Sequence, residues 1–247
     1  MVISLEKVTK IFKKNRVVDC VTVDFPDSTV SVVTGLSGSG KRTLLRLLAG
    51  ELKPDSGRIV NKNKGLIAYS EAGVSSFSGL GKSEIHAVWR LLYPDFDEEK
   101  FQTLNENDKA DAGIFDLSLA AASNAGTMIF YEPLLGLDME QKPKFLDLFK
   151  ELAESGKTVI VAVSEIDGFE TVAGRAVVLN GGNLIVAEEV NVLLATHRLF
   201  PGATTISPDY KVIGPVFNER LLQTDENIGR EATLKEIITG YINGSSS

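Results

Sequence analysis

Hydrophobic and polar positions alternate with a period of two at the start of the chain. Two short series carry this pattern: Ile3, Leu5 and Val8, and then Val21, Val23 and Phe25. Alternation of this kind predicts antiparallel strands that each bury one face. The run Val30–Thr34 is continuously apolar or β-branched instead, which predicts a strand buried on both faces.

The pattern changes to a helical one directly after that strand. Leu44, Leu45, Leu47 and Leu48 would share an apolar helix face, and Gly50 follows where a helix is expected to end. Further apolar strands are expected at Met128–Tyr131, Thr158–Val163 and Ala176–Leu179, with a helix near Lys142–Glu154. Strands that alternate with helices in this way predict an α/β fold around a mostly parallel sheet.

Two regions depart from the α/β alternation. Residues 72–125 are first rich in Ser and Gly and then helical, so we expect a helical insertion there, with Ser83 as a helix N-cap. The main domain is expected to cover residues 1–195. Residues 196–242 read as a β/α extension, and residues 243–247 as a flexible tail.

The composition narrows the range of possible functions. The 247 residues carry a formal net charge of −7, which argues against nucleic acid as the main partner. The apolar runs are too short to span a bilayer. A single cysteine, Cys20, predicts a reducing, cytoplasmic compartment and a buried strand position. His86 and His197 lack a ligand pattern and are expected at the surface, and we assign no residue as a metal ligand.

The strand at Val30–Thr34 leads into a glycine loop at residues 35–41 with the spacing G-x-x-x-x-G-K. Its residues are Gly35, Leu36, Ser37, Gly38, Ser39, Gly40 and Lys41. Glycines let consecutive backbone N–H groups turn inward around an anion, and the helix that follows adds its positive N-terminal end. A lysine in this position reaches the outer phosphates of a nucleotide. The loop therefore predicts a P-loop NTPase fold of the RecA-like type.

The residue after the lysine breaks this motif. A Ser or Thr hydroxyl is expected there, because it binds Mg²⁺, but the chain has Arg42. Thr43 lies one residue further, about 100° around the helix, and cannot simply replace that ligand. A guanidinium repels the metal, yet it can neutralise phosphate charge itself. The other reading is that Arg42 turns to solvent and the site is only weakened.

A second motif resembles a known family. The segment Thr127–Asp138 is an apolar strand that ends in an acidic position, followed by Pro and Gly-Leu-Asp. It is similar to the Walker B strand and D-loop of ABC-type ATPases, with Asp138 as the D-loop aspartate. In that family an acidic pair holds Mg²⁺ and polarises the attacking water. The corresponding pair here is Tyr131-Glu132, so the resemblance implies that the metal-side acid is replaced and that Glu132 is the remaining catalytic residue, or a vestige of one.

The same resemblance implies further site residues. Phe12 would stack on the adenine, and Ser164 stands where the family has a histidine that contacts the γ-phosphate. The glutamine after the strand near Tyr69 has no clear match, since Ser70, Glu71 and Ala72 occupy its place. Counting back from Glu132 puts the family's signature sequence at residues 107–111, where Asp108 would face a partner's phosphate with a like charge.

Two other segments, His86–Phe101 and Ala232–Tyr241, resemble the ATPases of two-component ABC exporters. The resemblance implies ATP or ADP as ligand, with Mg²⁺ in doubt. It also implies a membrane permease and a second ABC ATPase, identical or different, as partners at the inner face of the membrane. The replaced residues predict a non-canonical subunit with weak or absent hydrolysis. An active ATPase that powers export, and a nucleotide-independent regulatory or scaffold protein, remain the alternatives.

Overall fold

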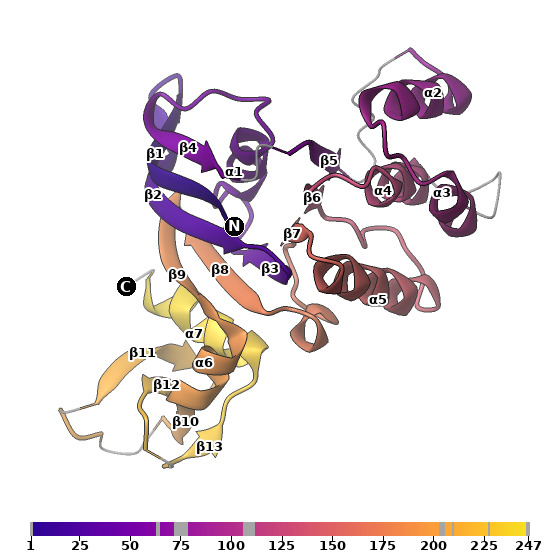
Figure 1. The fold of residues 1–247 in the computed structure, drawn as a ribbon. Coiled ribbons are helices and arrows are strands. Elements are labelled where there is room, and N and C mark those ends of the chain that lie inside the picture. The colour runs from indigo at the N-terminus through magenta and orange to yellow at the C-terminus, as the bar shows by residue number, and fades with distance from the viewer. Residues whose placement is uncertain are drawn as a thin grey trace.

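A mostly parallel six-stranded sheet forms the centre of the molecule (Figure 1). The computed structural model describes residues 2–62, 65–71, 79–105, 112–202, 206–208, 210–226 and 228–245. In sheet order the strands are β5 (Ile67–Glu71), β6 (Thr127–Tyr131), β7 (Thr158–Ala162), β3 (Thr29–Thr34), β8 (Arg175–Asn180) and β9 (Asn183–Glu189). β5 to β8 pair in parallel, and β9 returns antiparallel to β8. The predicted α/β class is therefore confirmed.

The central strand β3 shows why this sheet must be covered on both sides. Val30 and Val32 point into one hydrophobic cluster, whereas Val33 points into another on the opposite face. All three side chains are buried. A strand with two buried faces needs an uninterrupted apolar run, as predicted for Val30–Thr34.

One face of the sheet packs on helix α1 (Lys41–Leu48), which a second, antiparallel sheet covers in turn. That sheet has the order β2-β1-β4 and consists of β1 (Val2–Phe12), β2 (Asn15–Pro26) and β4 (Ser56–Asn61). The leucines of α1 lie in one cluster with Leu5 and Phe25 from this sheet and with Val33 from β3. The helix that follows the glycine loop is thus held between two sheets.

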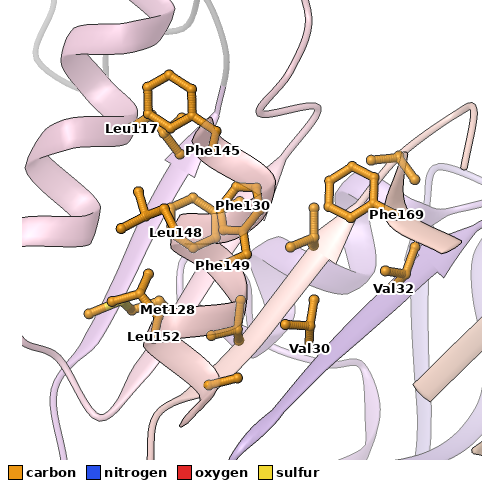
Figure 2. Close-up of a cluster of buried hydrophobic side chains, with 14 of the residues drawn as sticks. Val30, Val32, Leu117, Met128, Phe130, Phe145, Leu148, Phe149, Leu152 and Phe169 are labelled. Carbon is orange, nitrogen blue, oxygen red and sulfur yellow. The ribbon is translucent and has the colours of Figure 1, made fainter. Parts of the chain in front are cut away.

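Helices α4 (Ala112–Ala122) and α5 (Gln141–Glu154) cover the other face of the parallel sheet. Helix α3 (Glu98–Leu104) packs on α4, and α2 (Lys82–Leu92) and the 3₁₀ turn η1 (Phe169–Thr171) contribute side chains to the same hydrophobic cluster. Figure 2 shows the aromatic centre of this layer, where Phe149 of α5 lies between Phe130 of β6 and Phe169 of η1. The ring centroids of Phe149 are 5.0 Å from Phe130 and 5.9 Å from Phe169.

A third sheet follows β9, reached through α6 (Val190–Thr196). Its order is β11-β12-β10-β13, built from β10 (His197–Pro201), β11 (Lys211–Val216), β12 (Glu219–Gln223) and β13 (Arg230–Glu231). The last helix, α7 (Leu234–Gly244), packs against β11 and β12 and also reaches β8 and β9. It continues through Asn243 and Gly244, so the first two residues of the predicted tail are helical. Every helix in the described ranges is too short or too polar to cross a bilayer.

Three local predictions are wrong. Helix α2 begins with Gly81 as its N-cap, and Ser83 lies inside the first turn. Cys20 is exposed, since a left-handed φ of 51° in an irregular stretch of the β1–β2 pairing turns its side chain outward. His197 is buried, with Nδ1 2.9 Å from the carbonyl oxygen of Leu193 and Nε2 3.0 Å from the hydroxyl of Tyr241. Both ring nitrogens have partners, so the core accepts this histidine.

Phe149→Ala tests the aromatic centre of the helical layer. The ring is fully buried, so its loss should lower the free energy of unfolding by about 3–5 kcal/mol. Urea denaturation measures the change. Met139→Ala is the matched control, because that side chain is 88% exposed and its removal should cost less than about 0.5 kcal/mol. Equal losses in the two variants would contradict the packing described here.

Asp116→Asn tests a half-buried carboxyl group in α4. Burial raises the pKa of Asp116 to about 6, against a smaller opposing effect of Lys82. The native carboxyl thus holds a proton between its ordinary pKa of 3.8 and about 6, where the unfolded chain has lost it. Stability should therefore fall as pH rises through this window. The variant should remove that slope and gain on the order of 1 kcal/mol at pH 7, since solvent screens a partly exposed group.

The measurement is the free energy of urea unfolding at a series of pH values from 4 to 7. Asp147→Asn on α5 is the control, because that side chain is exposed. A pH slope that persists unchanged in Asp116→Asn would show that another group causes it.

Candidate functional site

The carboxyl ends of β3, β6 and β7 meet at one edge of the parallel sheet. The glycine loop leaves β3 at this edge and leads into α1 (Figure 1). Tyr131 and Glu132 stand at the end of β6, and Ser164 follows β7. Parallel strands bring their carboxyl ends to the same edge, so three distant segments of sequence converge on the loop.

Two glycines of the loop are required by geometry. Gly35 has a φ of +144°, and a Cβ there would lie 2.0 Å from the carbonyl oxygen of Leu179. Gly40 has a φ of +101°, and its Cβ would lie 2.4 Å from the carbonyl oxygen of Val17. Neither position accepts a side chain, because conformation and neighbouring backbone both exclude it. The loop is also tied to the β8–β9 turn, where the backbone N–H of Gly182 donates to the carbonyl of Ser39.

Lys41 begins α1 and is buried. Its ammonium donates hydrogen bonds to the carbonyl oxygens of Gly35 at 2.7 Å and Leu36 at 3.2 Å. Burial lowers its pKa, and the negative charge of Glu132 opposes that effect. The carbonyl oxygens of the loop itself therefore hold the cation against the start of the loop.

Arg42 forms an ion pair with Glu71, the last residue of β5. The distance from Arg42 Nε to Glu71 Oε1 is 2.6 Å, and the Arg42 side chain is half-exposed whereas that of Glu71 is 8% exposed. The other oxygen of Glu71 accepts a hydrogen bond from the hydroxyl of Tyr69 at 2.9 Å. The hydrogen bond to Glu71 raises the pKa of Arg42. Arg42 is thus fixed at the first turn of the helix rather than turned away to solvent.

The opposite wall holds Glu132 and Ser164. Ser164 Oγ donates a hydrogen bond of 2.5 Å to Glu132 Oε1. Glu132 has a left-handed φ of 49°, and its backbone N–H donates to the carbonyl of Ala162, which fixes the turn after β6. Burial raises the pKa of the neighbouring Tyr131 phenol, and the charge of Glu132 raises it further. Tyr131 therefore stays protonated and neutral at physiological pH.

A cavity of about 160 Å³ lies at the glycine loop. It is lined by Val17, Ser37, Gly38, Ser39, Gly40, Lys41, Arg42, Thr43, Tyr131 and Ser164. A neighbouring cavity of about 560 Å³ shares Tyr131 and Ser164 and adds Glu132 to its wall. Among the described residues, the buried hydroxyl of Ser39 has no hydrogen-bond partner. The smaller cavity therefore combines backbone N–H groups, two cations and a spare hydroxyl.

Most of the described residues singled out from the sequence line these two cavities, but Gly35, Phe12 and Asp138 do not. Phe12 lies at the end of β1, where its 42% exposed ring is 5.5 Å from the ammonium of Lys10. Asp138 precedes α5 and accepts hydrogen bonds from the backbone N–H groups of Glu140 and Gln141. Asp108 and the segment 107–111 lie outside the described residues.

The sequence prediction missed two residues that help to build the site. Val17 reaches the loop from β2, and the periodicity of that strand showed only that it is half-buried. Glu71 was noted by position alone, without its pairing to Arg42. A carboxylate at the end of a buried strand, together with an unexpected arginine in the glycine loop, is the sequence signal that could have revealed this pair.

The fold and the glycine loop together define a P-loop NTPase. The sequence profile described as "ABC transporter" matches residues 18–88. The arginine transport ATP-binding protein ArtM of Bacillus subtilis is 25% identical over 214 residues, covering 74% of this chain and 89% of its own. The aliphatic sulfonates import ATP-binding protein SsuB of Granulibacter bethesdensis is 25% identical over 202 residues, covering 77% of this chain and 85% of its own.

Solved structures of ATP-binding cassettes have the same fold. The ATP-binding subunit of an ABC transporter has a TM-score of 0.68 at 17% identity, covering 78% of this chain and 92% of its own. A dimeric ATP-binding cassette with bound ADP and Pi has a TM-score of 0.64 at 20% identity, covering 76% and 98%. The fold of this chain is therefore that of the ATP-binding cassettes of ABC transporters, and residues 18–88 match the ABC transporter family model.

This class of fold implies Mg²⁺ beside the phosphates, held in part by a hydroxyl directly after the loop lysine. The residues of this chain do not fit that ion. Arg42 stands at the hydroxyl position, and its cation is paired with Glu71. Tyr131, a neutral phenol, stands beside it at the end of β6. Within the described ranges, no group of three or more His, Cys, Asp or Glu side chains is placed to hold a metal.

Gly40→Ala tests the geometry of the glycine loop. The methyl group would meet the carbonyl oxygen of Val17 at 2.4 Å and the backbone would keep a φ of +101°, so the variant should be strongly destabilised. Gly38→Ala is the control, because its φ of +77° carries similar strain but nothing lies within 4 Å of the added Cβ. We expect Gly40→Ala to lose about 1–3 kcal/mol more than Gly38→Ala in thermal or urea unfolding. Equal losses would show that the loop does not pack against β2 as described.

Proposed function

We propose that this chain is a non-canonical ATP-binding subunit of an ABC transporter complex, with weak or absent hydrolysis. It binds ATP or ADP at the glycine loop. It docks on an integral membrane permease and pairs with a second ABC ATPase subunit, either a copy of itself or a different chain. Its place is the cytoplasm, at the inner face of the membrane.

The observation that carries this proposal is the contrast between the two halves of the site. The phosphate-binding half is complete, since Gly35, Gly40 and Lys41 hold the geometry that an anion requires. The half that would bind the metal ion and the attacking water differs from that of an active ATPase, because Arg42 and Tyr131 stand at the places of the metal ligands. Phosphoryl transfer depends on metal for much of its charge neutralisation. Binding is therefore retained while turnover is lost.

The state of Glu132 supports the same conclusion. One of its carboxylate oxygens accepts a hydrogen bond of 2.5 Å from the hydroxyl of Ser164. A general base must present a free oxygen toward the attacking water. Ser164 is neutral, so it cannot neutralise negative charge on a γ-phosphate as an imidazolium could. We infer that Glu132 polarises water poorly in this chain.

Relatives and exposed apolar side chains support the proposed partners. ArtM and SsuB are named as transport ATP-binding proteins, and the Nod factor export ATP-binding protein I of Neorhizobium galegae is 25% identical over 212 residues. On this chain, Leu91 and Leu92 at the end of α2 are 83% and 54% exposed. Leu135 and Met139, after β6, are 67% and 88% exposed. Clustered exposed apolar residues of this kind mark protein interfaces, one for the permease and one for the paired ATPase.

Measuring ATP hydrolysis by the purified chain, alone and together with its permease in lipid vesicles, tests the proposal. Turnover should be at least a hundredfold below the roughly 1 s⁻¹ at the lower end of ordinary enzymes. The residual rate should be the same for Glu132→Gln and Lys41→Ala, which identifies it as background.

Turnover near ordinary enzyme rates that falls in Glu132→Gln would contradict the proposal and establish an active ATPase. If neither ATP nor ADP binds in any of the buffers tested, the chain would instead be a nucleotide-independent scaffold protein.

A further inference from the structure

The ion pair between Arg42 and Glu71 occupies the place where this type of fold puts a metal ligand. Arg42 follows the loop lysine on α1, and Glu71 ends β5 on the neighbouring side of the loop. Their 2.6 Å contact joins a helix start to a sheet edge. Tyr69 holds the second carboxylate oxygen at 2.9 Å, so Glu71 is bound from both sides.

A divalent cation at this place would have to displace the guanidinium. Arg42 keeps its charge at any physiological pH, and two cations side by side repel each other. If Arg42 moved away to admit the metal, it would give up its contact with a carboxylate that is only 8% exposed. Breaking such a pair is costly because the buried charge loses its partner. The local charges therefore exclude the metal rather than merely binding it less tightly.

The same arrangement suits a phosphate. Arg42 uses Nε for Glu71, which leaves the two terminal nitrogens of the fork as donors. Planar guanidinium forks bind phosphate oxygens through two parallel hydrogen bonds. The side chain lines the cavity at the loop together with Lys41 and the partnerless Ser39 hydroxyl. Because Glu71 already fixes the guanidinium, little side-chain freedom is lost when a phosphate binds.

We propose that the glycine loop binds a nucleoside di- or triphosphate without a divalent cation, and that the Arg42 guanidinium takes the place of the metal. This inference rests on the proposed nucleotide-binding function and names the form of ligand that the site takes. It also explains the proposed absence of turnover by the binding mode. An arginine neutralises phosphate charge, but it does not supply the other functions of a metal ion in phosphoryl transfer.

The experiment is calorimetric titration of the full chain with ATP and with ADP, each in chelator and in excess Mg²⁺. Affinity in chelator should equal or exceed affinity with Mg²⁺. Arg42→Ser should weaken binding in chelator about tenfold or more, the size expected for a lost charge-assisted hydrogen bond. Arg46→Ser is the matched control, because it removes the same charge from the next turn of α1, where Arg46 pairs with Glu51 at 2.8 Å. Arg46→Ser should change the nucleotide affinity in chelator by less than about threefold.

A further variant separates folding from binding. Arg42→Ser leaves Glu71 buried without its cation, so the double variant Arg42→Ser/Glu71→Gln removes both charges together. It should fold with a thermal transition close to that of the wild-type chain and still lose the metal-free binding. Arg42→Lys should give an intermediate affinity, since it keeps the charge and loses the fork.

Two results overturn the inference. One is nucleotide binding that requires Mg²⁺, which would leave the proposed function of a weakly hydrolysing ATP-binding subunit intact. The other is unchanged metal-free affinity in both Arg42→Ser and the double variant. Failure of ATP and ADP to bind under every condition would overturn the proposed function together with this inference, and so is distinguishable from the other two.

Discussion

The ion pair between Arg42 and Glu71 sets what the glycine loop can do. Glu71 is a nearly buried carboxylate at the end of β5, and such a group needs a partner. Arg42 provides it from the first turn of α1, and Tyr69 provides the remaining hydrogen bond. The helix that carries the loop is thereby tied to the sheet edge through charge. Any ligand that enters the loop meets a guanidinium that is already oriented.

The rest of the site is consistent with that constraint. The parallel sheet brings the ends of β6 and β7 to the loop, so Glu132 and Ser164 must lie there whatever chemistry they perform. Their hydrogen bond satisfies one oxygen of the carboxylate without any metal or water. Lys41 and the backbone of the loop keep the features that bind anions. The residues suited to anion binding are thus different from those on which metal-dependent turnover would depend.

Much of the fold could be predicted from the sequence because its signals are local. Alternation in the first strands, the apolar run of β3 and the glycine spacing each reflect a requirement of neighbouring residues. The loop was predicted for the same reason, since its glycines are needed by backbone geometry at Gly35 and Gly40. The departures from the motif at Arg42 and Tyr131 could be read from the sequence once the glycine loop and the strand at Thr127–Tyr131 had been recognised.

Other features depend on tertiary contacts that no local pattern encodes. The partner of Arg42 lies on β5, and the contribution of Val17 comes from a strand of another sheet. His197 carries no sequence signal for burial, because Tyr241 meets it only when α7 packs beside the end of α6. Pairing between distant charges and burial of a polar ring are decided by the assembled fold, so they had to be found in the structure.

A crystal structure of the chain with ADP and excess Mn²⁺, analysed at the manganese absorption edge, tests the central claim most directly. The account predicts ADP in the glycine loop, the terminal nitrogens of Arg42 within hydrogen-bond distance of its phosphates, and no anomalous peak beside them. An Mn²⁺ ion bound between the phosphates and Glu71, with Arg42 displaced toward solvent, would contradict it.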